Sequence, residues 1–110
     1  MKTLKFEPKL CELILNGSKT VTWRFFDDKD LQIGDTLQFI NKETGENFGT
    51  ATITDLYTKT LGTLEEKDWV GHEGFSSTEE MYKTYKGYYG DRVDENTEVK
   101  IIRFDFKASY

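Results

Sequence analysis

Two short polar segments carry the residue types best suited to chemistry. The first, residues 17–24 (GSKTVTWR), places an amine, hydroxyls and a guanidinium directly after a glycine. The second, residues 71–75 (GHEGF), lies far along the chain and supplies a carboxylate. If the fold brings the two segments together, they form a small pocket with a cation, a hydroxyl and an acid. Such a pocket suits either a site that cleaves an amide or one that holds a polar ligand such as a nucleobase.

Amide hydrolysis needs a nucleophile, a group that accepts its proton and a group that protonates the leaving amine. Thr22 could attack if a base stands beside it. Lys19 can be that base only if burial or a nearby cation such as Arg24 lowers its pKa. Glu73 could keep Lys19 charged, orient the substrate or carry the proton to the departing amine. Lys19 and Thr22 would face opposite sides of an unbroken strand, so their pairing requires Lys19 at the corner between helix and strand.

Each of these residues also has an ordinary structural interpretation. Lys19 follows a helix-ending glycine, where the helix dipole favours a cation. Thr22 lies in a predicted strand, and threonine is common in strands. Glu73 belongs to an acidic stretch whose carboxylates are expected to be solvated. Only the three residues taken together favour a functional pocket.

Three neighbouring residues are candidates for binding the ligand. Trp23, flanked by Thr22 and Arg24, is the aromatic side chain that we expect nearest a ligand. Arg24 is expected in the pocket or in a surface ion pair rather than in catalysis. His72 is the only histidine, so a zinc site would need carboxylates and Cys11 to complete it. We therefore expect neither a metal nor another cofactor.

Length and composition restrict the possible classes of protein. The chain has 110 residues, enough for one domain (residues 1–110) with its own core. The single cysteine, Cys11, excludes an internal disulfide. Together with the absence of a signal-like N-terminus, it favours a reducing, cytoplasmic location. No apolar run approaches the ~20 residues of a membrane-spanning helix, so no membrane partner is expected.

The charge of the chain is acidic but unevenly distributed. The net charge of −5 counts against tight, non-specific binding of nucleic acid, and DNA is not expected as a partner. Residues 1–34 nevertheless carry six basic and five acidic groups. An anionic ligand should therefore approach this N-terminal part. Residues 65–80 hold six acids opposed by Lys67 alone and are expected to form a solvated face.

The elements that must position the candidate residues follow from periodicity and turn residues. Pro8 can occupy the first turn of a helix whose apolar residues recur at helical spacing, and Asn16-Gly17 supplies its stop. Residues rich in β-branched and aromatic types predict strands at 20–25, 36–40, 48–57 and 98–107. The last strand carries apolar residues on both faces, which indicates a central position in the sheet.

Two helix starts are expected in the second half. Residues 63–66 (TLEE) form a candidate capping box for a short helical turn. Residues 76–79 (SSTE) or 77–80 (STEE) would open another helix, and residues 85–89 are expected to form a tyrosine-rich loop. One sheet curled into a partial barrel, with two or three helices packed on it, fits this order, and the fold class is therefore α+β.

The ordered set of segments resembles the ASCH domain. The matching parts are the helix that ends in residues 17–24, the segment IGDTLQF at 33–39, the strand ATIT at 51–54, the residues EGF at 73–75 with the helix after them, and the closing strand at 99–106. The resemblance covers nearly the whole chain. It implies a PUA-like fold, which is a curled β-barrel with helices at its rim.

The same resemblance implies a site. The ASCH family is associated with RNA-related roles, and one small bacterial branch hydrolyses the acetyl amide of N4-acetylcytidine with a Lys-x-x-Thr pair and a downstream glutamate. Carried across, these are Lys19 as base, Thr22 as nucleophile and Glu73 as proton carrier. The spacing to the glutamate differs from that branch, so either His72 or Glu73 takes the acidic position.

Three functions remain open at this point. One is a small amidohydrolase acting on an acylated nucleoside. Another is a non-catalytic module that binds RNA or a modified base through Lys19 and Arg24, and here the acidic balance favours a small ligand over a long RNA. A third is a protein-interaction role in translation or transcription control through residues 65–80. The third role predicts that charge reversal at Glu79 or Glu80 matters, whereas alanine at Lys19 or Thr22 is silent.

Overall fold

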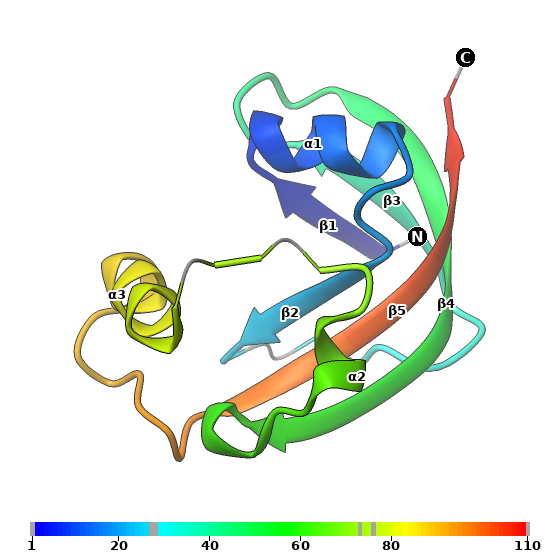
Figure 1. Ribbon diagram of the computed structural model, residues 1–110. Helices are drawn as coiled ribbons and strands as arrows, with labels where there is room; N and C mark the ends of the chain where they lie inside the picture. The colour runs from blue at the N-terminus through cyan, green and yellow to red at the C-terminus, as the bar shows by residue number, and fades with distance from the viewer. Residues whose placement is uncertain (1, 27–28, 73, 76, 110) are drawn as a thin grey trace.

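The chain folds into a strongly curled five-stranded sheet with helices at its rim (Figure 1). The computed structural model describes residues 2–26, 29–72, 74–75 and 77–109. In chain order the elements are β1 (Lys2–Phe6), α1 (Pro8–Leu15), β2 (Val21–Phe25), β3 (Thr36–Asn41), β4 (Asn47–Thr60), the 3-10 turn η1 (Leu61–Thr63), α2 (Glu66–Trp69), α3 (Thr78–Tyr89) and β5 (Glu98–Ala108). This is the α+β, PUA-like half-barrel expected from the sequence.

The order of the strands explains how the sheet closes on itself. The order is β1-β3-β4-β5-β2, so that β1 and β2 are the two edge strands. The β1–β3 pair is parallel and the other pairs are antiparallel. The long strands β4 and β5 bend together, with a register shift between Ile53 and Asp55. Figure 1 shows that this bend brings the β1 and β2 edges to the same side of the molecule.

The helix that precedes the first polar segment begins and ends as the sequence indicates. Pro8 occupies the start of α1, where its missing N–H costs nothing. Gly17 has a φ of 85°, and the N–H of Ser18 reaches back to the Leu13 carbonyl at 2.9 Å. This glycine-based cap turns the chain sharply, and the segment that holds Lys19 therefore lies between α1 and β2.

Three local expectations were wrong. The strand β1 was not predicted; it is short, and its parallel partner β3 lies 35 residues further along the chain. The capping box of α2 is formed by Glu65 and Asp68, rather than by residues 63–66. Residues 85–89 are helical rather than a loop, because α3 continues to Tyr89 and stops at Gly90, whose φ is 83°. Its start at Ser77, which accepts the Glu80 N–H, agrees with one of the two predicted capping boxes.

Two clusters of buried side chains fill the two faces of the sheet. One lies beneath α1 and includes Cys11 and Ile14. The other lies beneath α3 and includes Met81 and Tyr85. The strand β5 contributes to both clusters, with Ile102 in the first and Ile101 in the second. Its two-sided burial and its place between β4 and β2 confirm the prediction of a central strand. In the described part of the chain, every helix is too short or too polar to cross a membrane.

Candidate functional site

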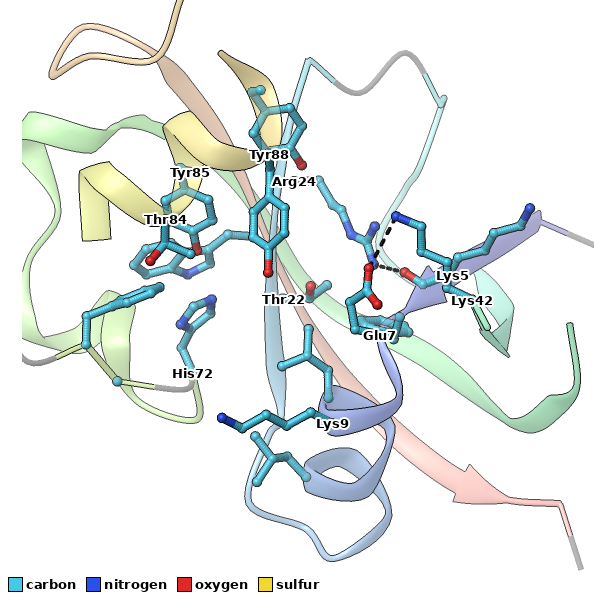
Figure 2. A pocket seen from close by; sticks show the side chains of 17 residues that line it. Lys5, Glu7, Lys9, Thr22, Arg24, Lys42, His72, Thr84, Tyr85 and Tyr88 are labelled. Carbon is cyan, nitrogen blue, oxygen red and sulfur yellow. Dashed lines mark hydrogen bonds and ion pairs between the residues drawn. The ribbon is translucent and has the colours of Figure 1, made fainter. Parts of the chain in front are cut away.

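A cavity of about 530 Å³ opens where the two edge strands approach each other. Its walls come from β1, the start of α1, β2, the turn after β3, residues 72 and 74–75, and one side of α3 (Figure 2). The volume lies within the range of sites for small ligands. Residues of both polar segments therefore line the cavity. The other lining residues come from elements whose proximity the sequence does not indicate.

Thr22 lies in the wall of this cavity. It belongs to β2, opposite Ile102 of β5, and its side chain is only 4% exposed. In Figure 2 its side chain lies between the α1 side and the α3 side of the cavity. Its hydroxyl makes no hydrogen bond to any residue that the structure describes. A buried hydroxyl in this position is available to a bound molecule.

Lys19 is buried behind this wall rather than in it. Its side chain is 2% exposed, and its ammonium donates to the Val21 carbonyl at 2.8 Å. Lys19 precedes the first residue of β2, so it lies at the corner between helix and strand, as its pairing with Thr22 requires. It does not line the cavity. Glu73, the third residue of the predicted catalytic set, lies outside the described residues.

Arg24 joins the two edge strands at the back of the cavity. Its guanidinium donates to the Lys5 carbonyl of β1 at 2.8 Å and lies over the Phe6 ring, 4.7 Å from the ring centroid. These contacts hold β2 beside β1 where no strand pairing does so. Arg24 therefore lines the cavity, which is one of the two positions expected for it. It also links β2 to β1 through these contacts.

Aromatic rings form the opposite side of the cavity. Trp23 and His72 are stacked with their ring centroids 4.0 Å apart and their planes 21° from parallel. Trp69 contacts the same indole edge-on at 4.6 Å. Trp23 and His72 both line the cavity. The indole N–H of Trp23 is buried and meets no acceptor in the described part of the chain, so an acceptor on a ligand would satisfy it.

The residues just before His72 are held to the sheet by hydrogen bonds from β5 and from the start of β2. The Gly71 carbonyl accepts the N–H groups of Thr20 and Val21 at 2.8 and 3.4 Å, just where β2 begins. Arg103 of β5 donates to the Val70 carbonyl at 2.9 Å. Because of these contacts, the two polar segments of the sequence lie side by side.

The short helix before this loop is held by a buried carboxylate. Asp68 is completely buried. It accepts hydrogen bonds from the Tyr57 hydroxyl at 2.7 Å, the Lys59 ammonium at 2.8 Å and the Glu65 N–H at 2.8 Å. Burial by itself would raise the pKa of Asp68, but these donors outweigh it and lower the pKa. The hydrogen bonds to Asp68, and then to Glu65, raise the pKa of Lys59. The expectation of a fully solvated acidic face is therefore wrong at Asp68.

The substitution Asp68→Asn should lower the free energy of unfolding by about 2–3 kcal/mol at neutral pH. The amide oxygen would accept from the Lys59 ammonium and the Glu65 N–H more weakly than the carboxylate does, and the amide NH2 would face the Tyr57 hydroxyl, which now donates to the carboxylate. Urea unfolding followed by circular dichroism measures this loss. The substitution Glu66→Gln is a matched control, because Glu66 is an exposed acid in the same turn, and it should cost less than about 0.5 kcal/mol.

The same pair of proteins tests the pKa of Asp68. Since the folded pKa is lowered, the stability that the carboxylate supplies is present above its unfolded pKa and is lost as the pH falls through the folded pKa. The difference between parent and Asp68→Asn should therefore shrink below about pH 4. A difference that persists undiminished in acid would contradict the assignment.

Two cations of the cavity were not singled out from the sequence. They are Lys9 on α1 and Lys42 after β3. Lys42 forms an ion pair with Glu7 at 3.3 Å (Figure 2). A lysine in the first turn of a helix, where the dipole disfavours a cation, was the available signal for Lys9. Among the described residues, no group of three potential metal-ligating side chains lies close enough to hold a metal ion.

Comparison with solved structures identifies the architecture. An ASCH domain from Lactobacillus crispatus superposes with a TM-score of 0.72 at 16% identity, covering 92% of this chain and 72% of that one. The chain has the fold of ASCH domains. ASCH from Zymomonas mobilis matches with a TM-score of 0.69 at 14% identity over 96% of this chain and 68% of that one. A Pyrococcus furiosus protein solved by NMR matches with a TM-score of 0.67 at 20% identity over 96% of each chain.

These ASCH-like matches concern architecture alone. No family model and no curated protein matches the sequence. At such low identity a shared fold carries no information about activity, because one fold supports many functions. The chemistry must therefore be argued from the cavity itself.

Proposed function

We propose that the cavity binds a nucleoside and cleaves an acyl amide on its base, as in N4-acetylcytidine, with Thr22 as the nucleophile. The observation that carries the proposal is the buried Thr22 hydroxyl, which lies in the cavity wall beside the stacked Trp23 and His72 rings. Aromatic faces are suited to stacking a base. A base held there would place its exocyclic acyl group within the same cavity as the hydroxyl.

The reaction follows the usual course of covalent amide hydrolysis. The Thr22 oxygen attacks the acyl carbonyl carbon while Lys19, as a neutral amine, accepts the hydroxyl proton. The C–N bond then breaks, and the nitrogen leaves as the amino group of the base after taking a proton. By the resemblance, Glu73 carries that proton. Water hydrolyses the resulting threonine ester and releases the carboxylic acid.

The surroundings of Lys19 support its role as the base. Burial to 2% exposure disfavours the charged form of an amine, and a base must be uncharged. The hydrogen bond to the Val21 carbonyl is compatible with a neutral amine, which still has N–H groups to donate. The corner position of Lys19, outside the pleat of β2, allows it to approach the face of the strand that carries Thr22.

The decisive experiment incubates purified protein with N4-acetylcytidine and follows cytidine and acetate by chromatography. We expect both products in equal amounts. N4-methylcytidine, which lacks the carbonyl, is the control substrate and should remain intact. No cytidine release from N4-acetylcytidine, at concentrations where binding is detected, would exclude this reaction and leave a binding function.

A non-catalytic module that binds RNA or a modified base is the second candidate. The basic side chains in the cavity wall favour it, because phosphates attract lysine and arginine. Binding of N4-acetylcytidine without turnover, unaffected by removal of the Thr22 hydroxyl, is the result expected from this alternative.

A further inference from the structure

The wall of the cavity has the opposite charge to the chain as a whole. Among the described residues that line it, four side chains are basic and one is acidic, whereas the chain carries a net charge of −5. The basic residues are Lys5, Lys9, Arg24 and Lys42, and the acid is Glu7. A partly enclosed site of one sign concentrates ligands of the other sign. The charge of the wall therefore suits an anionic ligand.

Lys9 is the cation best placed to meet such a ligand. It lies in the first turn of α1. That turn holds no acidic residue, although a helix N-terminus favours acids and disfavours cations. Its ammonium makes no ion pair with any residue in the described part of the chain. Figure 2 shows its side chain extending from α1 along the cavity toward the side of His72. A position that opposes local stability in this way is typical of a binding role.

Lys42 supplies a second positive charge that is partly neutralised in the free protein. Its ammonium is 3.3 Å from a Glu7 carboxylate oxygen. The Glu7 side chain makes no capping hydrogen bond to α1, and the Leu10 and Cys11 N–H groups donate to its backbone carbonyl instead, which a side-chain substitution keeps. Removing this carboxylate would leave Lys42 available to an anion while the fold stays intact.

We propose that the ligand of this cavity is a nucleoside monophosphate rather than an uncharged nucleoside, with its phosphate held by Lys9. The inference rests on the proposed nucleoside pocket and names the charge class of its ligand. The base lies against the aromatic side of the cavity that Trp23 and His72 form.

A single nucleotide fits the surroundings of the cavity better than a long RNA does. A second hollow of about 380 Å³ contains the acids Asp94 and Glu98 beside Arg92. Acidic groups there would repel a phosphate backbone that continued from the first cavity. The lining of the second hollow has two acids and one base, so it does not extend the basic wall of the first cavity.

Isothermal titration calorimetry with cytidine and cytidine 5′-monophosphate tests the inference. We expect the monophosphate to bind about tenfold more tightly at low salt, and the ratio to fall at high salt. Lys9→Gln should reduce the ratio by at least about threefold. Glu7→Gln should increase the ratio of the two affinities, because the cavity wall loses one negative charge and Lys42 loses its ion pair with Glu7. Lys107→Gln is the matched control, since Lys107 is an exposed lysine outside the cavity and its loss should leave the ratio unchanged.

Each contrary result has a separate meaning. Equal affinity for the two ligands would overturn the inference and leave the proposed nucleoside pocket intact. Equal affinity for the monophosphate and ribose 5-phosphate, or much tighter binding of an oligocytidine RNA, would also overturn it. If neither cytidine nor its monophosphate binds, the inference and the pocket both fail. If the ratio is as expected but N4-acetylcytidine is not hydrolysed, the proposed reaction alone fails.

Discussion

Replacing Thr22 with valine should abolish the release of cytidine from N4-acetylcytidine, lowering kcat by roughly a thousandfold or more. Valine has nearly the shape of threonine and high strand propensity, so the β2–β5 pairing and the buried environment of the residue are kept. The only polar group lost is the Thr22 hydroxyl, which is the proposed nucleophile. Steady-state kinetics of cytidine release measures the effect, and thermal unfolding confirms that the variant remains folded.

Two further variants separate a nucleophile from a group that only contacts the ligand. Thr22→Ser keeps the hydroxyl and should retain measurable turnover. Lys19→Met keeps the length of the buried side chain but loses the amine, and it should lower kcat by a similar factor. Any residual rate should no longer show the rise with pH that deprotonation of a lysine base gives to the parent. A Thr22→Val variant that retains more than a tenth of the parent kcat would exclude threonine as the nucleophile.

The regular elements near the first polar segment could be predicted because their signals are local. Pro8, the apolar spacing after it and the Asn16-Gly17 stop define α1 almost to the residue. The two-sided apolar pattern of the last strand places β5 at the centre of the sheet. These patterns reflect short-range geometry and burial, which the order of residues records directly.

The missed elements depend on contacts between distant parts of the chain. β1 is only five residues long and pairs with β3, so its own sequence shows little. The end of α3 contains Gly87, a poor helix former, yet it stays helical. Tyr85 and Tyr89 pack against the Phe25 ring at 4.5 and 5.2 Å, and this packing outweighs the local preference.

The same distinction applies to the candidate site. Trp23, Arg24 and His72 were singled out because they flank residues with evident chemistry, and all three line the cavity. Lys9 and Lys42 were not found because the cavity exists only where the curl of the sheet brings β1 beside β2. Arg24 fixes that approach through the Lys5 carbonyl, a contact between two edge strands that no local pattern indicates.

Gly71 should be the residue of the second polar segment least able to change, and Gly71→Ala should lower the free energy of unfolding by about 3 kcal/mol or more. Its φ is 85°, a conformation that costs any residue with a side chain. A Cβ atom there would lie 2.0 Å from the Thr20 Oγ1 atom. The loop would have to move away from β2, which breaks the hydrogen bonds from the Thr20 and Val21 N–H groups to the Gly71 carbonyl.

Matched variants separate the conformational cost from the steric cost. Gly45→Ala is the control for conformation, because Gly45 has a φ of 75° and open space around its Cβ position, and it should cost only about 1–2 kcal/mol. The double variant Gly71→Ala with Thr20→Ala removes the clashing oxygen and should recover part of the stability lost by Gly71→Ala alone. Equal losses for Gly71→Ala and Gly45→Ala would show that the contact with Thr20 does not constrain the loop. Because this contact also holds His72 beside Trp23, Gly71→Ala should change the tryptophan fluorescence of the folded protein and weaken cytidine binding, whereas Gly45→Ala should do neither.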